Sequence, residues 1–129
     1  GLNRLEGAYA WRTLIEDGAM IAGGSDAPVE RGEARIEFYA AAVRRDLSGF
    51  ADEHWNLDQA LDRETALKLF TIWPAYATFR EDELGTIEVG KIADFSVFDR
   101  DLMTVPDTDL AEARPVMTVV DGEVVWRAE

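Results

Sequence analysis

The four residues Ala19-Met20-Ile21-Ala22 are all apolar, and the polar segment Gly23-Gly24-Ser25-Asp26-Ala27-Pro28 follows them directly. A short apolar run bounded by glycines is typical of a strand buried on both faces, as in the parallel sheets of α/β proteins. Before the run, apolar side chains recur at three- and four-residue spacing over residues 5–17, which predicts a helix that Gly18 ends. Helix, buried strand and glycine-bearing loop together predict an α/β fold with a strand over about residues 19–23.

Further helices are predicted at residues 34–47 and 62–73 from the same spacing of apolar side chains. Asp62 is a suitable N-cap for the second of these helices. Pro74 is expected to kink or end it, with another short helical turn at residues 75–79. Residues 48–61 carry no helical or strand pattern and are expected to form a loop.

The character of the chain changes at Leu84, after which glycine turns and alternating apolar residues replace the helical spacing. Residues 93–98 alternate as a half-buried strand does. Asp121-Gly122 lies between two runs rich in β-branched residues, at 116–120 and 123–126, and predicts a hairpin with a type I′ turn. We therefore place a domain boundary near residue 84, which divides the chain into segments 1–83 and 84–129.

Composition excludes several classes of function. Acidic residues outnumber basic ones 26 to 13, and the net charge of −13 disfavours binding to nucleic acid. No apolar run approaches the length of a membrane helix, and no signal peptide is visible, so we expect a cytoplasmic protein without a membrane partner. The absence of cysteine rules out disulfides, thiolate metal sites and a cysteine nucleophile.

Asp26 is the principal candidate for chemistry. It comes just after the predicted strand, at the strand end where parallel α/β folds place their reactive groups. The alternative is a structural role, because Ser-Asp-Ala-Pro also suits a turn.

Several segments resemble the amidohydrolase superfamily, in particular its amidohydrolase 3 branch. Residues 24–29 are similar to the segment after the last barrel strand, and residues 9–14 and 66–77 to the helices on either side of it. Residues 84–95 are similar to the re-entry into the family's small β-sandwich, and residues 116–125 to its closing hairpin. The resemblance implies the last βα portion of a (β/α)8 TIM barrel, followed by C-terminal strands of a β-sandwich.

By the same resemblance, the complete protein would hydrolyse amide, carbamate or cyclic-amide C–N bonds of a small-molecule substrate, with a deaminase subtype as a further option. Asp26 matches the family's last-strand aspartate, which contacts a divalent metal, expected to be zinc, and acts as general acid and base. The family's metal-binding histidines have no counterpart here. The one histidine, His54, lies outside any ligand motif and is interpreted as a surface or interface imidazole.

Weaker candidates have simpler interpretations. Arg44-Arg45-Asp46 could reach an acidic substrate, but a salt bridge at a helix end is the preferred role. Lys91 is expected to be solvated in a turn. The tryptophans at positions 11, 55 and 73 could line a pocket, although most such aromatics belong to a core.

Two hypotheses follow. In the first, the chain is part of a metal-dependent amidohydrolase that is inactive by itself, and it either self-associates or requires a missing N-terminal portion. In the second, it is a non-catalytic acidic domain for assembly or binding.

Overall fold

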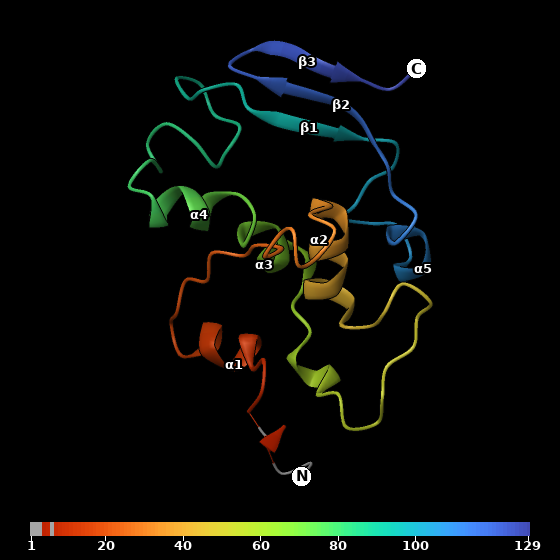
Figure 1. Ribbon diagram of the computed structural model, residues 1–129. Helices are drawn as coiled ribbons and strands as arrows, with labels where there is room; N and C mark the ends of the chain where they lie inside the picture. The colour runs from red at the N-terminus through yellow and green to blue at the C-terminus, as the bar shows by residue number, and fades with distance from the viewer. Residues whose placement is uncertain (1–3, 6) are drawn as a thin grey trace.

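The computed structural model describes residues 4–5 and 7–129, in which a helical part adjoins a small antiparallel sheet (Figure 1). The helical elements are α1 (Trp11–Glu16), α2 (Ala34–Val43), the 3-10 turn η2 (Leu57–Gln59), α3 (Arg63–Lys68), α4 (Ile72–Ala77) and α5 (Asp107–Leu110). The strands are β1 (Phe95–Phe98), β2 (Pro115–Val120) and β3 (Glu123–Arg127). This mixture of helices and strands agrees with the predicted α/β class at its coarsest level. The barrel, the sandwich and the boundary near residue 84 stay predictions.

Helix α2 is at the centre of the core. Its Phe38, Tyr39 and Val43 are buried together with Leu61, Ala66, Leu69 and Leu110. These partners come from the segments around α3 and from α5, so α2 holds the two sides of the helical part together. Figure 1 shows α2 between α3 and α5, with the sheet beyond them.

The three strands form one sheet in the order β1-β2-β3. The Asp121-Gly122 turn joins β2 to β3, and its two residues have φ values of 50° and 77°. Positive φ at both positions is what a type I′ turn requires, so the predicted hairpin is confirmed. Every residue of β3 is exposed.

The prediction of a strand at residues 19–23 is wrong for the described chain. These residues lie in no sheet, although the N–H of Gly23 donates to the carbonyl of Leu69 at 2.8 Å. A strand exists only through hydrogen bonds to a neighbouring strand. None of the described residues supplies that neighbour, because the sheet consists of β1, β2 and β3 alone.

Two helix ends also differ from prediction. Helix α2 ends at Val43 rather than at residue 47, because Arg44 takes a left-handed conformation with φ 56° and ψ 41°. Pro74 does not end a helix; it is the third residue of α4, where its missing N–H has no intrahelical acceptor to lose. The predicted helix from residue 62 is split into α3 and α4 at residues 69–71, before Pro74. Its Asp62 N-cap is confirmed, because the side chain accepts a hydrogen bond from the N–H of Thr65.

The first predicted helix is shorter than expected. Helix α1 begins at Trp11, and Tyr9 before it has a φ of 53°. Residue 6 of the predicted span lies outside the described residues. At the other end, Gly18 has a φ of 95°, which confirms it as the residue that ends the helix.

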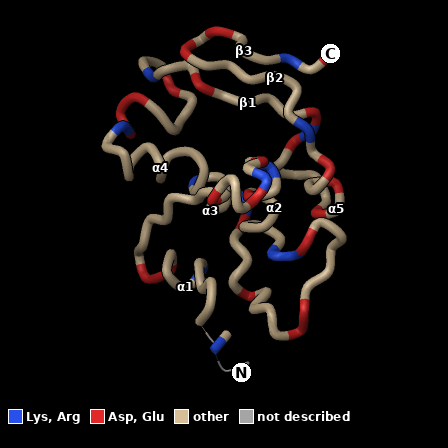
Figure 2. The backbone as a smooth tube through the Cα atoms, viewed as in Figure 1, with Lys and Arg blue, Asp and Glu red and all other residues tan. Residues whose placement is uncertain are grey.

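Acidic side chains are not confined to one part of the described chain (Figure 2). Acidic residues occur in the helical part and around the sheet alike (Figure 2). Within the described residues, no helix is long and apolar enough to cross a membrane.

Candidate functional site

Asp26 lies in the loop between the 19–24 segment and α2. Its backbone is left-handed, with a φ of 56°, a conformation that aspartate tolerates better than most residues. The turn is closed by the N–H of Val29, which donates to the Asp26 carbonyl at 2.9 Å. The side chain is exposed, and among the described residues no hydrogen bond or ion pair occupies its carboxylate. The carboxylate is therefore available to a ligand from outside this chain.

The two glycines before Asp26 have different roles. A Cβ on Gly23 would come within 2.7 Å of Cε1 of Phe70, so the Phe70 ring, two residues after α3, would have to shift to accept a larger residue there. A Cβ on Gly24 would meet nothing within 4 Å. The chain thus packs tightly at Gly23 and borders open space one residue later.

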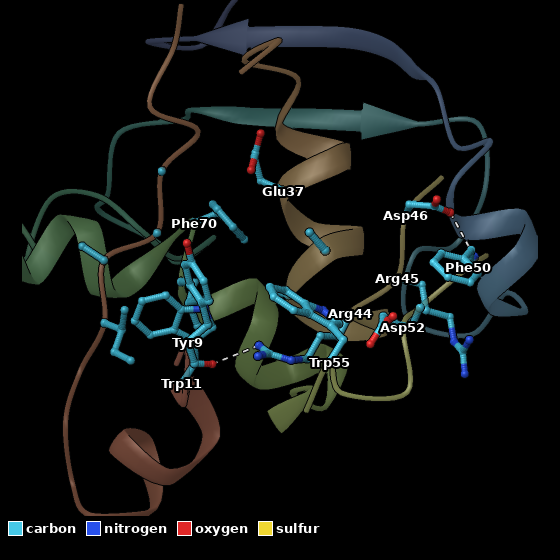
Figure 3. Close-up of a pocket in the computed structure, with 18 residues that line it drawn as sticks. Tyr9, Trp11, Glu37, Arg44, Arg45, Asp46, Phe50, Asp52, Trp55 and Phe70 are labelled. Atoms are coloured by element: carbon cyan, nitrogen blue, oxygen red, sulfur yellow. Dashed lines mark hydrogen bonds between the residues drawn. The ribbon is translucent and has the colours of Figure 1, made fainter. Parts of the chain in front are cut away.

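That open space is a groove of about 640 Å³ between the 19–24 segment and α2 (Figure 3). Small residues of both segments line it, namely Ala22, Gly23, Gly24, Ala40 and Ala41. Tyr9, Trp11, Phe50, Trp55 and Phe70 add aromatic surface. Asp26 is not a lining residue but follows Gly24 by two positions. The groove is mostly apolar, and a flat or slender organic group would fit its lining.

Arg44 holds one end of the groove together. The residue is only 6% exposed, and its guanidinium lies 4.9 Å from the ring centroid of Trp55. Nη1 donates to the carbonyl of Tyr9 at 3.0 Å, and Nη2 to that of Ala8 at 3.5 Å. The Tyr9 ring in turn packs on Trp55 and on Trp11, at centroid distances of 5.6 and 5.8 Å. Arg44 therefore ties the N-terminal segment, α2 and the 50–56 loop to one another.

The salt bridge predicted for the Arg44-Arg45 helix end is wrong. Both side chains donate to backbone carbonyls, Arg45 to that of Gly49 at 3.1 Å. Among the described residues, Nε of Arg44 is buried without a partner. Burial lowers the pKa of Arg44 because desolvation disfavours its charge, and nearby Asp58 opposes that effect.

Glu37 is a groove residue that the sequence reasoning did not identify. It lies in the first turn of α2 and is half-buried, and no hydrogen bond or ion pair to its carboxylate occurs within the described residues. Burial raises the pKa of Glu37, and the charge of Glu30 adds to that effect. Part of the signal was present in the sequence: Glu37 and Ala41 are four residues apart, which places them on one face of the predicted helix.

The other candidates lie elsewhere. His54 has a side chain that is 41% exposed and lines no part of the groove, in agreement with a surface imidazole. Trp73 packs against the core, while Trp11 and Trp55 line the groove. The prediction of a solvated Lys91 is wrong: its side chain is 13% exposed, and Nζ donates to the carbonyl of Glu81. Lys91 therefore stabilises the loop that contains it.

The described residues do not form a metal site on their own. They contain no group of three or more His, Asp or Glu side chains placed to hold an ion. A catalytic zinc needs about three protein ligands, and Asp26 offers one carboxylate.

Comparisons with known proteins agree with one another. The Amidohydrolase family matches residues 1–126. The protein YtcJ of Bacillus subtilis (strain 168) is 32% identical over 126 residues, a match covering 98% of this chain and 24% of YtcJ. N-substituted formamide deformylase of Arthrobacter pascens is 32% identical over 111 residues, covering 86% of this chain and 20% of that protein.

A solved structure gives the same result. An amidohydrolase from Thermotoga maritima MSB8 matches with a TM-score of 0.64 at 26% identity, covering 93% of this chain and 26% of that one. The chain thus spans about a quarter of the length of the relatives that it matches.

Proposed function

The chain belongs to the Amidohydrolase family, and on that premise we propose that the complete protein is a metal-dependent hydrolase of C–N bonds. Its substrates are small molecules with an amide, carbamate or cyclic-amide bond. The name of one relative, an N-substituted formamide deformylase, supports an amide among these. A deaminase of the same superfamily is the second option. The non-catalytic acidic domain is not favoured, because the match to YtcJ and the match to the Thermotoga maritima structure each extend over more than nine-tenths of the chain.

One observation carries the proposal. The Asp26 carboxylate is exposed and has no partner among the described residues, in a loop that begins at the groove. The Asp26 side chain does not close its turn, in contrast to that of Asp46, which accepts bonds from the N–H groups of Ser48 and Phe50. In the proposed reaction, the Asp26 carboxylate takes a proton from the attacking water and returns it to the leaving nitrogen.

The metal of this proposal is shared with other parts of the protein. Asp26 would supply a single oxygen ligand, and the remaining ligands would come from outside the 129 residues. The ion, expected to be zinc, supplies Lewis acidity toward water when it is bound. In the corresponding architecture, residues 1–83 contribute the last βα portion of a (β/α)8 barrel, and β1, β2 and β3 belong to a β-sandwich.

The experiment compares this chain with the complete polypeptide. We expect the purified 129-residue chain to bind Zn²⁺ weakly, with no stoichiometric metal after dialysis and elemental analysis. The complete polypeptide should retain metal and release amine from a panel of N-substituted formamides, and a chelator should stop the release. Tight zinc in the isolated chain, or a complete polypeptide without metal or hydrolysis, would contradict the proposal.

A further inference from the structure

The groove has opposite charges along α2. Glu37 lies in the first turn of α2 and Arg44 is its C-cap residue, seven positions later, so their backbones are separated by roughly 10 Å along the helix axis. Between them lie Ala40 and Ala41, which leave the wall of the groove apolar and unobstructed. Figure 3 shows Glu37 near Phe70 at one end and Arg44 against Trp55 toward the other.

The two charged groups are not equally available. The guanidinium of Arg44 already donates to two backbone carbonyls and lies on the Trp55 ring. The Glu37 carboxylate has no such partner within the described residues, and it is half-buried at the edge of an apolar space. A half-buried carboxylate without a partner is costly, and a cation that enters the groove would relieve that cost.

We propose that the groove binds a primary ammonium group attached to an alkyl or arylalkyl body, with Glu37 as its counter-ion. The body lies over Ala40 and Ala41 toward the aromatic side chains of Tyr9 and Trp55. The orientation follows from charge, since the ammonium group is attracted by Glu37 and repelled by Arg44. The net charge of −13 also favours the approach of a cation over that of an anion.

This inference rests on the proposed function and makes its substrate class narrower. When water adds to the carbonyl carbon of an amide and the C–N bond breaks, the nitrogen keeps the bonding electron pair and takes a proton. The products are a carboxylic acid and an amine, and an alkyl amine is an ammonium ion at neutral pH. A groove that holds an ammonium group and its apolar body would bind the amine product, and it would thereby indicate which N-substituents the substrate carries.

The test is a titration of the 129-residue chain with 2-phenylethylammonium chloride, followed by calorimetry and by NMR shifts of the Ala40 and Ala41 amides. We expect binding in the groove. Two probes with the same phenylethyl body, the neutral 2-phenylethanol and the anionic 3-phenylpropionate, should bind about tenfold more weakly, or more weakly still, because a hydrogen bond to a charged group contributes at least about the free energy of a tenfold change.

Variants of Glu37 test whether its carboxylate, and not the general negative charge of the chain, binds the ammonium group. Glu37→Gln should lower the affinity for 2-phenylethylammonium about tenfold, and Glu37→Asp should retain part of it. Glu112→Gln makes the same change of charge at an exposed residue outside the groove and should alter the affinity less than twofold. Circular dichroism confirms that each variant is folded.

Equal binding of the alcohol and the ammonium, equal losses in the two Gln variants, or no binding of any probe to the folded chain would each overturn the inference. The experiments distinguish a failure of the amine groove from a failure of the proposed function. A complete polypeptide that hydrolyses C–N bonds while Glu37→Gln leaves amine affinity unchanged would refute only the amine groove.

Discussion

The guanidinium of Arg44 lies 4.9 Å from the ring centroid of Trp55 while it donates to the carbonyl of Tyr9 at 3.0 Å. One buried side chain therefore joins the end of α2 to two segments that have no regular structure of their own. Replacing Arg44 with Met would leave the carbonyls of Tyr9 and Ala8 without their donor. We expect Arg44→Met to lower the free energy of unfolding by about 1.5–3 kcal/mol, the range for hydrogen bonds from charged groups.

Arg45→Met is the matched control for Arg44→Met. Arg45 is exposed and its one bond joins residues of the same loop, so its loss should alter stability by less than about 0.5 kcal/mol. Urea denaturation of both variants gives the comparison. Equal effects would show that the contacts of Arg44 do not hold these segments.

A second pair of variants tests the packing at Gly85. Gly85 and Gly90 have φ values of 89° and 98°, so alanine is strained at either position. Only at Gly85 would a Cβ also collide, at 2.7 Å from Cα of Ile72, whereas at Gly90 it would meet nothing within 4 Å. We expect Gly90→Ala to cost about 1–2 kcal/mol and Gly85→Ala at least about 1 kcal/mol more. Thermal unfolding that ranks Gly90→Ala as the worse variant would contradict this packing.

Asp62 gives a prediction about pH. The N–H and the hydroxyl of Thr65 donate to its carboxylate at 2.8 and 2.7 Å, and these bonds hold the pKa of Asp62 below its usual range. A carboxyl group whose pKa is lower in the folded state stabilises the fold above its unfolded pKa, near 4. That contribution is lost as the pH falls through the folded pKa. Asp62→Ala should therefore cost about 1 kcal/mol at pH 7, and less at pH 3.

Asp82→Ala is the control for this pH series, because Asp82 is exposed and accepts no hydrogen bond from the described residues. Its unfolding midpoint should follow that of the unchanged chain from pH 7 to pH 3. A constant difference between Asp62→Ala and the unchanged chain over the whole range would show that the ionised carboxylate is not the capping species.

The exposed edge of the sheet predicts self-association. Val124, Val125 and Trp126 of β3 are 52%, 58% and 46% exposed, and an edge strand with apolar side chains tends to pair with another chain. We expect light scattering at tens of micromolar to show dimers or larger species. Val125→Lys should shift them toward the monomer, and Val29→Lys, in a loop at 76% exposure, should not. A clean monomer that unfolds cooperatively would contradict the prediction.

Local chemistry made part of the fold predictable. The type I′ turn at Asp121-Gly122 and the cap at Asp62 each depend on a few adjacent residues, and both were predicted. The 19–23 strand depends on hydrogen bonds to distant partners, which an apolar pattern does not reveal. Arg44 was misinterpreted for a similar reason: its acceptors are the carbonyls of Ala8 and Tyr9, about 35 positions away in the sequence. The family was predictable because several short motifs occur in the family's order over nearly the whole chain.

The candidate site was predicted less completely than the fold. Asp26 was identified by its place after an apolar run and a pair of glycines, and its catalytic role stays a prediction. Glu37 was missed because an isolated glutamate on an amphipathic helix is normally solvated. Its importance depends on the apolar groove beside it, and that groove forms only when residues 21–24 pack near α2.

The central claim concerns Asp26 and is tested most directly by the turnover of the complete polypeptide with Asp26→Asn. Asparagine keeps the size of the side chain but cannot accept the proton of the attacking water, so kcat for amine release should fall by at least about a hundredfold. The unfolding midpoint should stay close to that of the unchanged protein, and Glu30→Gln, an exposed change in the same loop, should retain turnover. Turnover near the original value in Asp26→Asn would contradict the assignment of Asp26 as the catalytic carboxylate.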